Sequence, residues 1–166
     1  MNIGRPVRQE PLLVPDHEPI SGSRMWQVED GRLFGPARGA GWPPGGPLWA
    51  WCPRASLHDE RPVPHARCTC GIYAMRSAGS LGRPAAIAAR SWAARWNPAF
   101  VLGEVHLWGR VFEHDLGWRA EWARPVGLYR TWDPSLDVSM QELLERYGLD
   151  VRVRGEDEPP RQLVPA

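Results

Sequence analysis

The sequence predicts an α+β domain, in which an antiparallel sheet and two helices are joined by long loops rich in glycine and proline. Three observations lead to this prediction. Apolar and polar residues alternate over residues 101–123, and apolar residues recur at helical spacing over residues 136–147. The 17 glycines and 18 prolines make up about a fifth of the 166 residues, which indicates many turns and extended segments.

The length of the chain favours one domain with a hydrophobic core of its own. Residues 1–20 carry four prolines and no hydrophobic periodicity, and we expect them to form a flexible arm. The globular domain is predicted over residues 21–154. Residues 155–166 are charged and contain prolines, which is typical of a disordered tail.

Two short strands are expected near the start of the domain, at Met25–Val28 and Arg32–Phe34, because an Asp-Gly turn signal lies between them. Residues 35–47 are so rich in Gly and Pro that they must form a loop. The segment Cys70–Met75 is compatible either with a short strand or with the start of a helix.

The two helices are predicted from their end signals. Pro84 suits the first position of a helix over residues 85–96, and Asn97-Pro98 ends it. A second helix is expected after Asp133-Pro134-Ser135, with Gly148 as its C-terminal cap. Its apolar stripe consists of Leu136, Met140, Leu143, Leu144 and Tyr147. Val151 and Val153 then indicate a closing strand.

The clearest element is a hairpin of two strands over residues 101–114 and 118–123, with Asp115–Gly117 as a three-residue loop. Alternation in the first strand predicts one apolar face, which contains Val105, Leu107, Gly109 and Val111. The opposite face contains Glu104, His106, Trp108, Arg110, Phe112 and His114.

The segment from Cys52 to Cys70 predicts a structural zinc site. Cys52, Cys68 and Cys70 supply three thiolates, and His65 completes the set, with His58 as the alternative fourth ligand. Long loops inside a compact domain need something to fix them, and a bound metal ion provides that stabilisation directly. Two other interpretations remain open: three ordinary buried thiols, or a redox pair formed by Cys68 and Cys70.

The order of several motifs resembles a group of small uncharacterised bacterial proteins, most of them actinobacterial. The motifs are Trp42-Pro43-Pro44-Gly45, Cys68-Thr69-Cys70-Gly71-Ile72-Tyr73-Ala74, Gly103-Glu104-Val105-His106-Leu107-Trp108-Gly109-Arg110-Val111 and Gly117-Trp118-Arg119-Ala120-Glu121. The resemblance covers roughly residues 22–154. It implies that the cysteine segment and the hairpin belong to one module, and it brings no known activity.

Two further sets of residues are candidates for binding. His114, Arg119 and Glu121 lie near the hairpin turn, where they form either a polar binding cluster or a set of cross-strand salt bridges. Trp42 lies within the Gly/Pro-rich region, and Trp49 and Trp51 follow it. We expect these tryptophans to contact a partner or to cover the cysteine site. The hairpin tryptophans, Trp108, Trp118 and Trp122, fit either the core or a stacking platform.

Charge and motif content exclude several classes of function. The formal net charge is +1 with arginines spread along the chain, which disfavours a nucleic-acid partner. No nucleotide-binding loop, metalloprotease motif or serine-hydrolase motif is present. No apolar run is long enough to span a membrane and no secretory signal is visible, so we expect a cytoplasmic protein with no membrane partner.

The sequence therefore predicts a small binding or adaptor module that is stabilised by zinc and that takes an unknown protein or small ligand as its partner. One alternative is an enzyme of unknown reaction with a pocket around the 104–121 hairpin, near His106, His114, Arg119 and Glu121. The other is a nucleic-acid-binding accessory protein.

Overall fold

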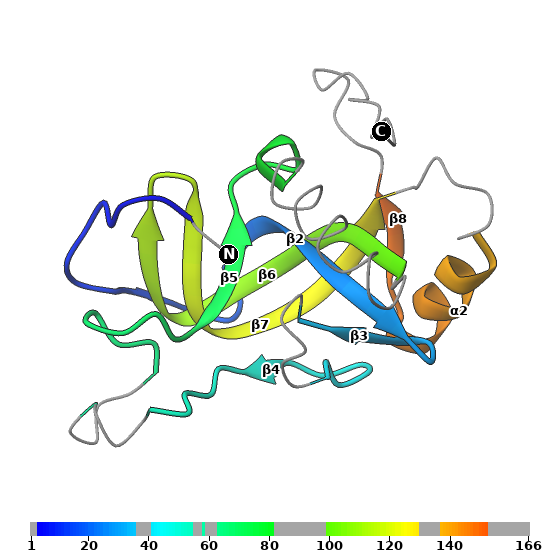
Figure 1. The fold of residues 1–166 in the computed structure, drawn as a ribbon, viewed down its shortest axis with the longest axis horizontal. Helices are drawn as coiled ribbons and strands as arrows, with labels where there is room; N and C mark the ends of the chain where they lie inside the picture. Colours follow the sequence, from blue (N-terminus) through cyan, green and yellow to red (C-terminus); the bar gives the residue numbers. More distant parts are fainter. Residues whose placement is uncertain are drawn as a thin grey trace, which may run out of the picture.

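The computed structural model describes residues 3–35, 41–54, 58, 63–81, 99–129 and 137–152. Eight strands in these ranges form one sheet, and a helix packs at one end of it (Figure 1). The strands are β1 (Leu12–Val14), β2 (Ile20–Glu29), β3 (Arg32–Phe34), β4 (Leu48–Trp49), β5 (Ile72–Met75), β6 (Ala99–His114), β7 (Gly117–Tyr129) and β8 (Asp150–Arg152). The helix is α2 (Asp137–Tyr147).

The strand pairings partly confirm the predicted fold class. A sheet and a helix are present, but the sheet is mixed and not purely antiparallel, because β8 pairs with β7 in parallel. The prediction was wrong here for a topological reason. The chain leaves the end of β7, passes through α2, and returns to the same edge of β7, and such a crossover gives a parallel pair.

The pairings among β6, β2, β5 and β7 close on themselves. β6 pairs with β2, β2 with β5, β5 with β7, and β7 again with β6. The interior of this ring holds the main hydrophobic core, to which the predicted apolar face of β6 contributes Val105, Leu107 and Val111, each fully buried. In Figure 1 the two long strands β6 and β7 run through the whole molecule, with the hairpin turn at one end and α2 at the other.

The β6–β7 hairpin is confirmed, but its loop is shorter than predicted. His114 pairs with Gly117, so that only Asp115 and Leu116 form the turn. Gly117 is needed for space and not for a left-handed conformation, because a Cβ atom there would collide with the backbone oxygen of Ala74. A bulge opposite Glu121, in which Gly109 adopts a φ of 76°, interrupts the ladder further along.

Most other predicted elements agree with the structure where it describes them. The Asp30-Gly31 turn joins β2 to β3, and both of its residues have positive φ angles of 50° and 63°. Gly148 ends α2 with a φ of 61°, and the amide of Leu149 donates to the oxygen of Leu144. The Cys70–Met75 segment contains a strand, β5.

The remaining predictions concern the N-terminal segment, the first predicted helix and the C-terminal tail. Within the N-terminal segment that was expected to be an arm, Leu12–Val14 form β1 and pair with β6. The helix predicted over residues 85–96 and the tail at 155–166 lie outside the described residues.

We predict that Gly103→Ala destabilises the fold by about 2–3 kcal/mol, because β6 and β7 leave no room for a side chain there. The added Cβ would lie 3.0 Å from the Trp26 ring and 3.1 Å from the Leu128 Cα, and it would collide with the Gly127 oxygen. Urea denaturation measures the change. Gly46→Ala is the control, because its nearest neighbour, Pro43, would be 3.9 Å away. Equal losses in both variants would contradict this interpretation.

Candidate metal centre

The register of β7 brings the cysteines together. β4 pairs with β7 at Trp122 and Ala123, and the amide of Ala50 donates to the oxygen of Glu121 at 2.7 Å. Ala120, which directly precedes Glu121 in β7, pairs with Ile72 of β5. The chain that leaves β4 and the chain that enters β5 therefore lie at neighbouring positions along one strand. Cys52 follows β4, and Cys68 and Cys70 precede β5, so this arrangement places the three thiols at one point.

The four residues Cys52, His58, Cys68 and Cys70 converge there. Each offers one donor atom, and these donor atoms all lie within 4.8 Å of one another. The Cys52 sulfur is 3.8 Å from that of Cys68 and 3.6 Å from His58 Nε2, which in turn is 3.9 Å from the Cys70 sulfur. The thiols are free, and 3.8 Å is far longer than a sulfur–sulfur bond of about 2.05 Å. The cluster is therefore not a disulfide, and it could hold a metal ion.

These separations agree with a tetrahedral zinc site. With zinc–sulfur bonds of about 2.3 Å and zinc–nitrogen bonds of about 2.0–2.1 Å, the edges of a tetrahedron are about 3.8 Å between sulfurs and about 3.6 Å from sulfur to nitrogen. Three of the six edges of the cluster, at 3.8, 3.6 and 3.9 Å, lie within 0.3 Å of those values, and all six are at most 4.8 Å. The four donor atoms are therefore close enough to coordinate a common ion after an adjustment of their positions.

The fourth member of the cluster is His58, the alternative that the sequence left open, and not His65, the preferred ligand. His65 lies beside the cluster, and its ring stacks on that of His58 with 5.0 Å between the centroids. Its backbone serves the site instead. The His65 amide donates to the Cys70 sulfur at 3.4 Å, and its oxygen accepts from the Cys68 amide at 3.1 Å. The spacing of residues could not distinguish the two histidines, because both precede Cys68 within one loop.

The electrostatics of the cluster favour a cation at its centre. Burial raises the pKa of the Cys68 thiol, but hydrogen bonds with His58, Cys70 and Cys52 outweigh burial and lower this pKa to about 6. Burial raises the pKa of the Cys70 thiol to about 11, a backbone hydrogen bond from His65 opposes this rise, and the charges of Cys68 and Cys52 add to it. Three thiolates cannot share this space without a positive charge between them.

Arg119 ties the cysteine loop to the hairpin. Its side chain is buried, with 4% exposed, and one guanidinium nitrogen donates to the backbone oxygens of Cys68 and Cys70, the latter at 2.9 Å. Its Nε donates to His114 Nε2 at 3.1 Å, and its guanidinium lies over the Phe112 ring. One arginine of β7 thus orients the segment that carries two of the four donor residues.

The predicted polar cluster of the hairpin is brought together only in part. His114 and Arg119 are in contact, but Glu121 lies at the bulge, where its carboxylate accepts from the backbone amide of Arg110 at 3.1 Å. His114 also bonds to the oxygen of Gly4 at 3.3 Å. These three side chains therefore form hydrogen bonds that hold neighbouring segments of the chain in place.

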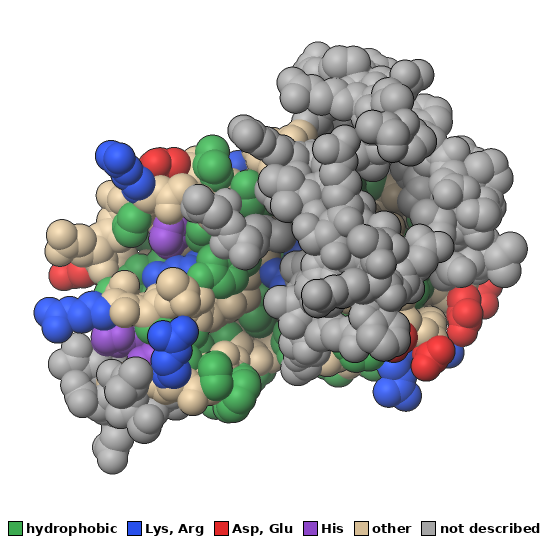
Figure 2. All heavy atoms as spheres, viewed as in Figure 1, with side chains coloured by type: hydrophobic (Ala, Val, Ile, Leu, Met, Phe, Trp, Pro, Cys, Tyr) green, Lys and Arg blue, Asp and Glu red, His purple; other side chains and the backbone are tan. Residues whose placement is uncertain are grey.

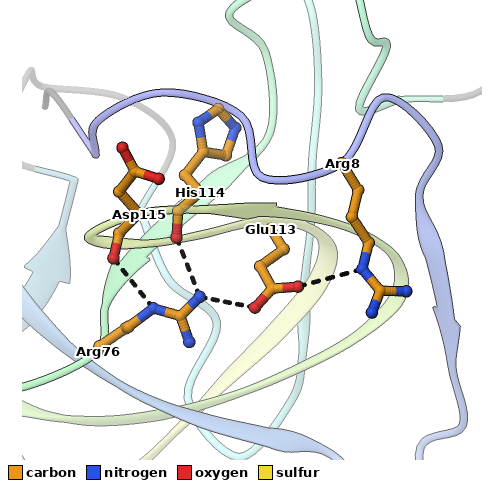
Figure 3. A network of polar contacts seen from close by, with 5 residues as sticks. All are labelled: Arg8, Arg76, Glu113, His114 and Asp115. Carbon is orange, nitrogen blue, oxygen red and sulfur yellow. Dashed lines mark hydrogen bonds and ion pairs between the residues drawn. The ribbon is translucent and has the colours of Figure 1, made fainter.

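A second set of polar contacts surrounds the hairpin turn (Figure 3). Arg76 donates to the backbone oxygens of His114 and Asp115 at 3.1 Å each and pairs with the Glu113 carboxylate at 2.7 Å, while Arg8 reaches the other oxygen of that carboxylate at 3.5 Å. These contacts fix the turn against the chain after β5 and against the N-terminal segment. Arginine and histidine side chains also lie close together on the surface at this end of the molecule, at the left of Figure 2.

The three loop tryptophans occupy different environments. Trp42 is 2% exposed and packs edge-on against Trp26, with 5.6 Å between the ring centroids, so it belongs to the core and cannot contact a partner as predicted. Burial of the large apolar surface of the indole ring is favourable, which accounts for this position. Trp49 and Trp51 are exposed, at 53% and 71%.

One feature near the predicted hairpin pocket was not found from the sequence. A cleft of about 490 Å³ contains His106, one of the residues named for such a pocket, but its other walls come from distant segments. The lining residues are Pro43, Gly45, Gly46, His106, Arg124, Pro125, Val126, Tyr147, Gly148 and Asp150. Alternation along β7 could have placed Arg124 beside His106, but no local signal brings Gly148 and Asp150 to the same place.

Comparisons of the chain with protein-family models, with curated proteins and with solved structures each gave no match. Among the described residues, no helix is both long and apolar enough to cross a membrane.

We predict that Arg119→Met destabilises the protein by about 3 kcal/mol, because the buried carbonyls of the cysteine loop would lose their charged donor. Arg76→Met is the matched control. Its side chain is 39% exposed, so its loss is expected to cost about 1 kcal/mol or less. Thermal and urea denaturation of both variants measure the difference. An Arg119 variant no less stable than the Arg76 variant would refute the proposed anchoring role.

We predict that His114 titrates below the ordinary histidine pKa of about 6.5. Burial disfavours the imidazolium, the hydrogen bond with Gly4 opposes this effect, and the charge of Arg119 lowers the pKa further. The unfolded chain then takes up the proton first as the pH falls. The contribution of His114 to stability is complete above about pH 6.5 and declines as the pH falls from there to the folded pKa. An NMR titration of the imidazole measures it, and a pKa at or above the ordinary value would contradict the prediction.

Proposed function

We propose that this protein is a small cytoplasmic binding module whose loops are fixed by one structural zinc ion. The observation that carries the proposal is the convergence of three thiols and one imidazole within 4.8 Å, in which three of the six separations are close to those of a tetrahedral site. Cys and His donors in this geometry are typical of zinc. Hard cations such as Mg²⁺ and Ca²⁺ prefer oxygen ligands, which this cluster lacks.

The donor set supports a structural role for the ion. A catalytic zinc ion keeps one position for water or substrate, whereas four protein donors fill the coordination sphere. Cys52 and His58 are buried, and the sulfurs of Cys52 and Cys70 each accept a backbone amide, from Arg54 and His65 respectively, at 3.4 Å. Amide donors of this kind orient thiolate ligands and stabilise their charge.

The ion would act as a cross-link between β4 and β5. Residues 53–67 join the two ligand-bearing ends, and none of the described strands or helices lies between β4 and β5 to hold this segment. Metal binding supplies folding free energy directly, because the site does not exist in the unfolded chain. A reducing compartment, in which thiols stay free of disulfides, suits three cysteines in this arrangement.

The binding role rests on the tryptophans that the centre holds at the surface. Trp49 and Trp51 lie three residues and one residue before the ligand Cys52, and both side chains are exposed. Exposed tryptophans on a fixed segment are favourable contact residues, because a rigid indole buries a large area at a small entropic cost. Folding of this segment and presentation of its aromatic surface would thus depend on the same ion.

We predict that the purified protein carries close to one zinc ion per chain and that a strong chelator lowers its melting temperature. The stacked histidines provide a matched pair of variants. His58→Ala removes a ligand and is expected to lower zinc content and stability, whereas His65→Ala retains both. Atomic emission spectrometry measures the metal, and cobalt substitution reports thiolate ligation through charge-transfer absorption.

Two results would overturn the zinc proposal. The first is protein that folds with a negligible content of any metal and is indifferent to the chelator. The second is loss of metal in His65→Ala together with full retention in His58→Ala, since this would assign the fourth ligand to the wrong residue.

A further inference from the structure

The cleft lies at a part of the β7 edge with which no strand of the described chain pairs. Among the described strands, β4 covers this edge at residues 122–123 and β8 covers it at residues 127–129. Arg124, Pro125 and Val126 lie between the two and line the cleft. Proline has no amide hydrogen to offer a further strand, which helps to keep this edge open. A volume of about 490 Å³ is in the range of sites that hold small molecules.

A row of three tryptophans crosses the sheet beside the cleft. Trp108 of β6 pairs in register with Trp122 of β7, and Trp122 pairs with Trp49 of β4. Directly paired residues of antiparallel strands project from the same face. The rings of Trp49 and Trp122 are in contact, with 6.1 Å between their centroids and 34° between their planes. The outermost ring, that of Trp49, is 53% exposed.

The row of tryptophans and the cleft share one face of the sheet. His106 and Arg124 are register partners, and each lies two residues along its strand from Trp108 or Trp122. Leu107 and Ala123, which separate the two rows, are fully buried on the other face. Residues two apart in a strand are separated by about 7 Å. A row of aromatic side chains thus lies next to a cleft that is lined by a guanidinium and an imidazole.

We propose that this face binds a nucleotide monophosphate, either free or as part of a single strand. The base stacks on the exposed Trp49 ring, and the phosphate enters the cleft toward Arg124 and His106. Trp49 pairs with Trp122, which lies two residues from Arg124, so the stacking ring and the guanidinium are diagonal neighbours on adjacent strands. Every base offers a flat face for stacking, and arginine is well suited to phosphate. The inference rests on the proposed function for Trp49, whose segment the zinc ion would fix, but the ion itself makes no contact with the nucleotide.

The negative charges near the cleft are expected to limit the length of the phosphate chain. Asp150 and Gly148, which follows α2, line one part of the cleft. We call this part the negative wall, because it includes an acidic residue and the C-terminal end of a helix. Within the described part of the chain, neither Arg124 nor Asp150 forms a salt bridge. One phosphate can contact Arg124, but additional phosphates would approach the negative wall. We therefore expect a monophosphate to bind more tightly than a triphosphate.

The test is a titration of the zinc-loaded full-length protein with adenosine 5′-monophosphate, followed by calorimetry and by quenching of tryptophan fluorescence. Saturable binding is expected. Adenosine, which lacks the phosphate, and ribose 5-phosphate, which lacks the base, are each expected to bind at least about ten-fold more weakly. Adenosine 5′-triphosphate is expected to bind more weakly than the monophosphate.

Paired variants locate the site. Trp49→Ala and Arg124→Gln are each expected to weaken binding about ten-fold or more. Their matched controls, Leu13→Ala and Arg32→Gln, remove an exposed apolar side chain and an exposed arginine elsewhere on the sheet and are expected to leave binding unchanged. Arg124 is exposed, so its variant tests the site even if Trp49→Ala disturbs β4.

A short oligoadenylate distinguishes the two sources of the nucleotide. Binding of the strand much more tightly than the monophosphate, with a steep salt dependence, indicates a single-stranded nucleic acid, and equal affinities indicate a free nucleotide. Several outcomes would overturn the proposal: no saturation by the monophosphate at millimolar concentration, equal binding of ribose 5-phosphate, tighter binding of the triphosphate, or affinities that neither Trp49→Ala nor Arg124→Gln changes.

Discussion

The register along β7 is the constraint on which the rest of the structure depends. This strand pairs with β6 on one side, and its other side is shared in succession by β5, β4 and β8. A shift of one residue would turn every side chain to the opposite face. It would separate the donor residues, move Arg119 away from the cysteine loop, and disrupt the row of tryptophans. Gly117 and Gly103 stand where neighbouring backbone leaves no space for a Cβ atom, and both help to fix this register.

The sequence was sufficient for local elements and for the type of site, and insufficient for choices that depend on tertiary contact. Alternation predicted the β6–β7 hairpin, and the Asp30-Gly31 signal predicted the turn between β2 and β3, because both are set by neighbouring residues. The three cysteines of the cluster were found from their chemistry. The choice between His58 and His65 could not be made, because it depends on how the loop folds back over β7. The parallel β8 and the burial of Trp42 were missed for the same reason.

Several arginines of this protein act as cross-links between segments of backbone. Arg119 holds the cysteine loop, Arg76 holds the hairpin turn, and Arg146 reaches the oxygen of Asp30 at 3.3 Å from α2. A planar guanidinium can donate several hydrogen bonds in fixed directions at once, which suits it to joining carbonyls of segments that have no regular pairing. Arg24 does so inside the core, where burial lowers its pKa to about 10 and the Trp42 ring lies 5.2 Å from its guanidinium.

The position of the donor residues at the ends of β4 and β5 has a consequence for how the chain can change over evolutionary time. Pairing of β4 and β5 with β7 fixes the positions of the cysteines at the two ends of the 53–67 segment. These positions therefore do not depend on the length of the segment. Doubling such a loop costs only about 0.6 kcal/mol of closure entropy. Insertions between His58 and Cys68 are therefore expected to be tolerated where His58 still reaches the cluster, while the two-residue step from Cys68 to Cys70 stays fixed. This segment could diversify in length, and acquire new contacts, without loss of the fold.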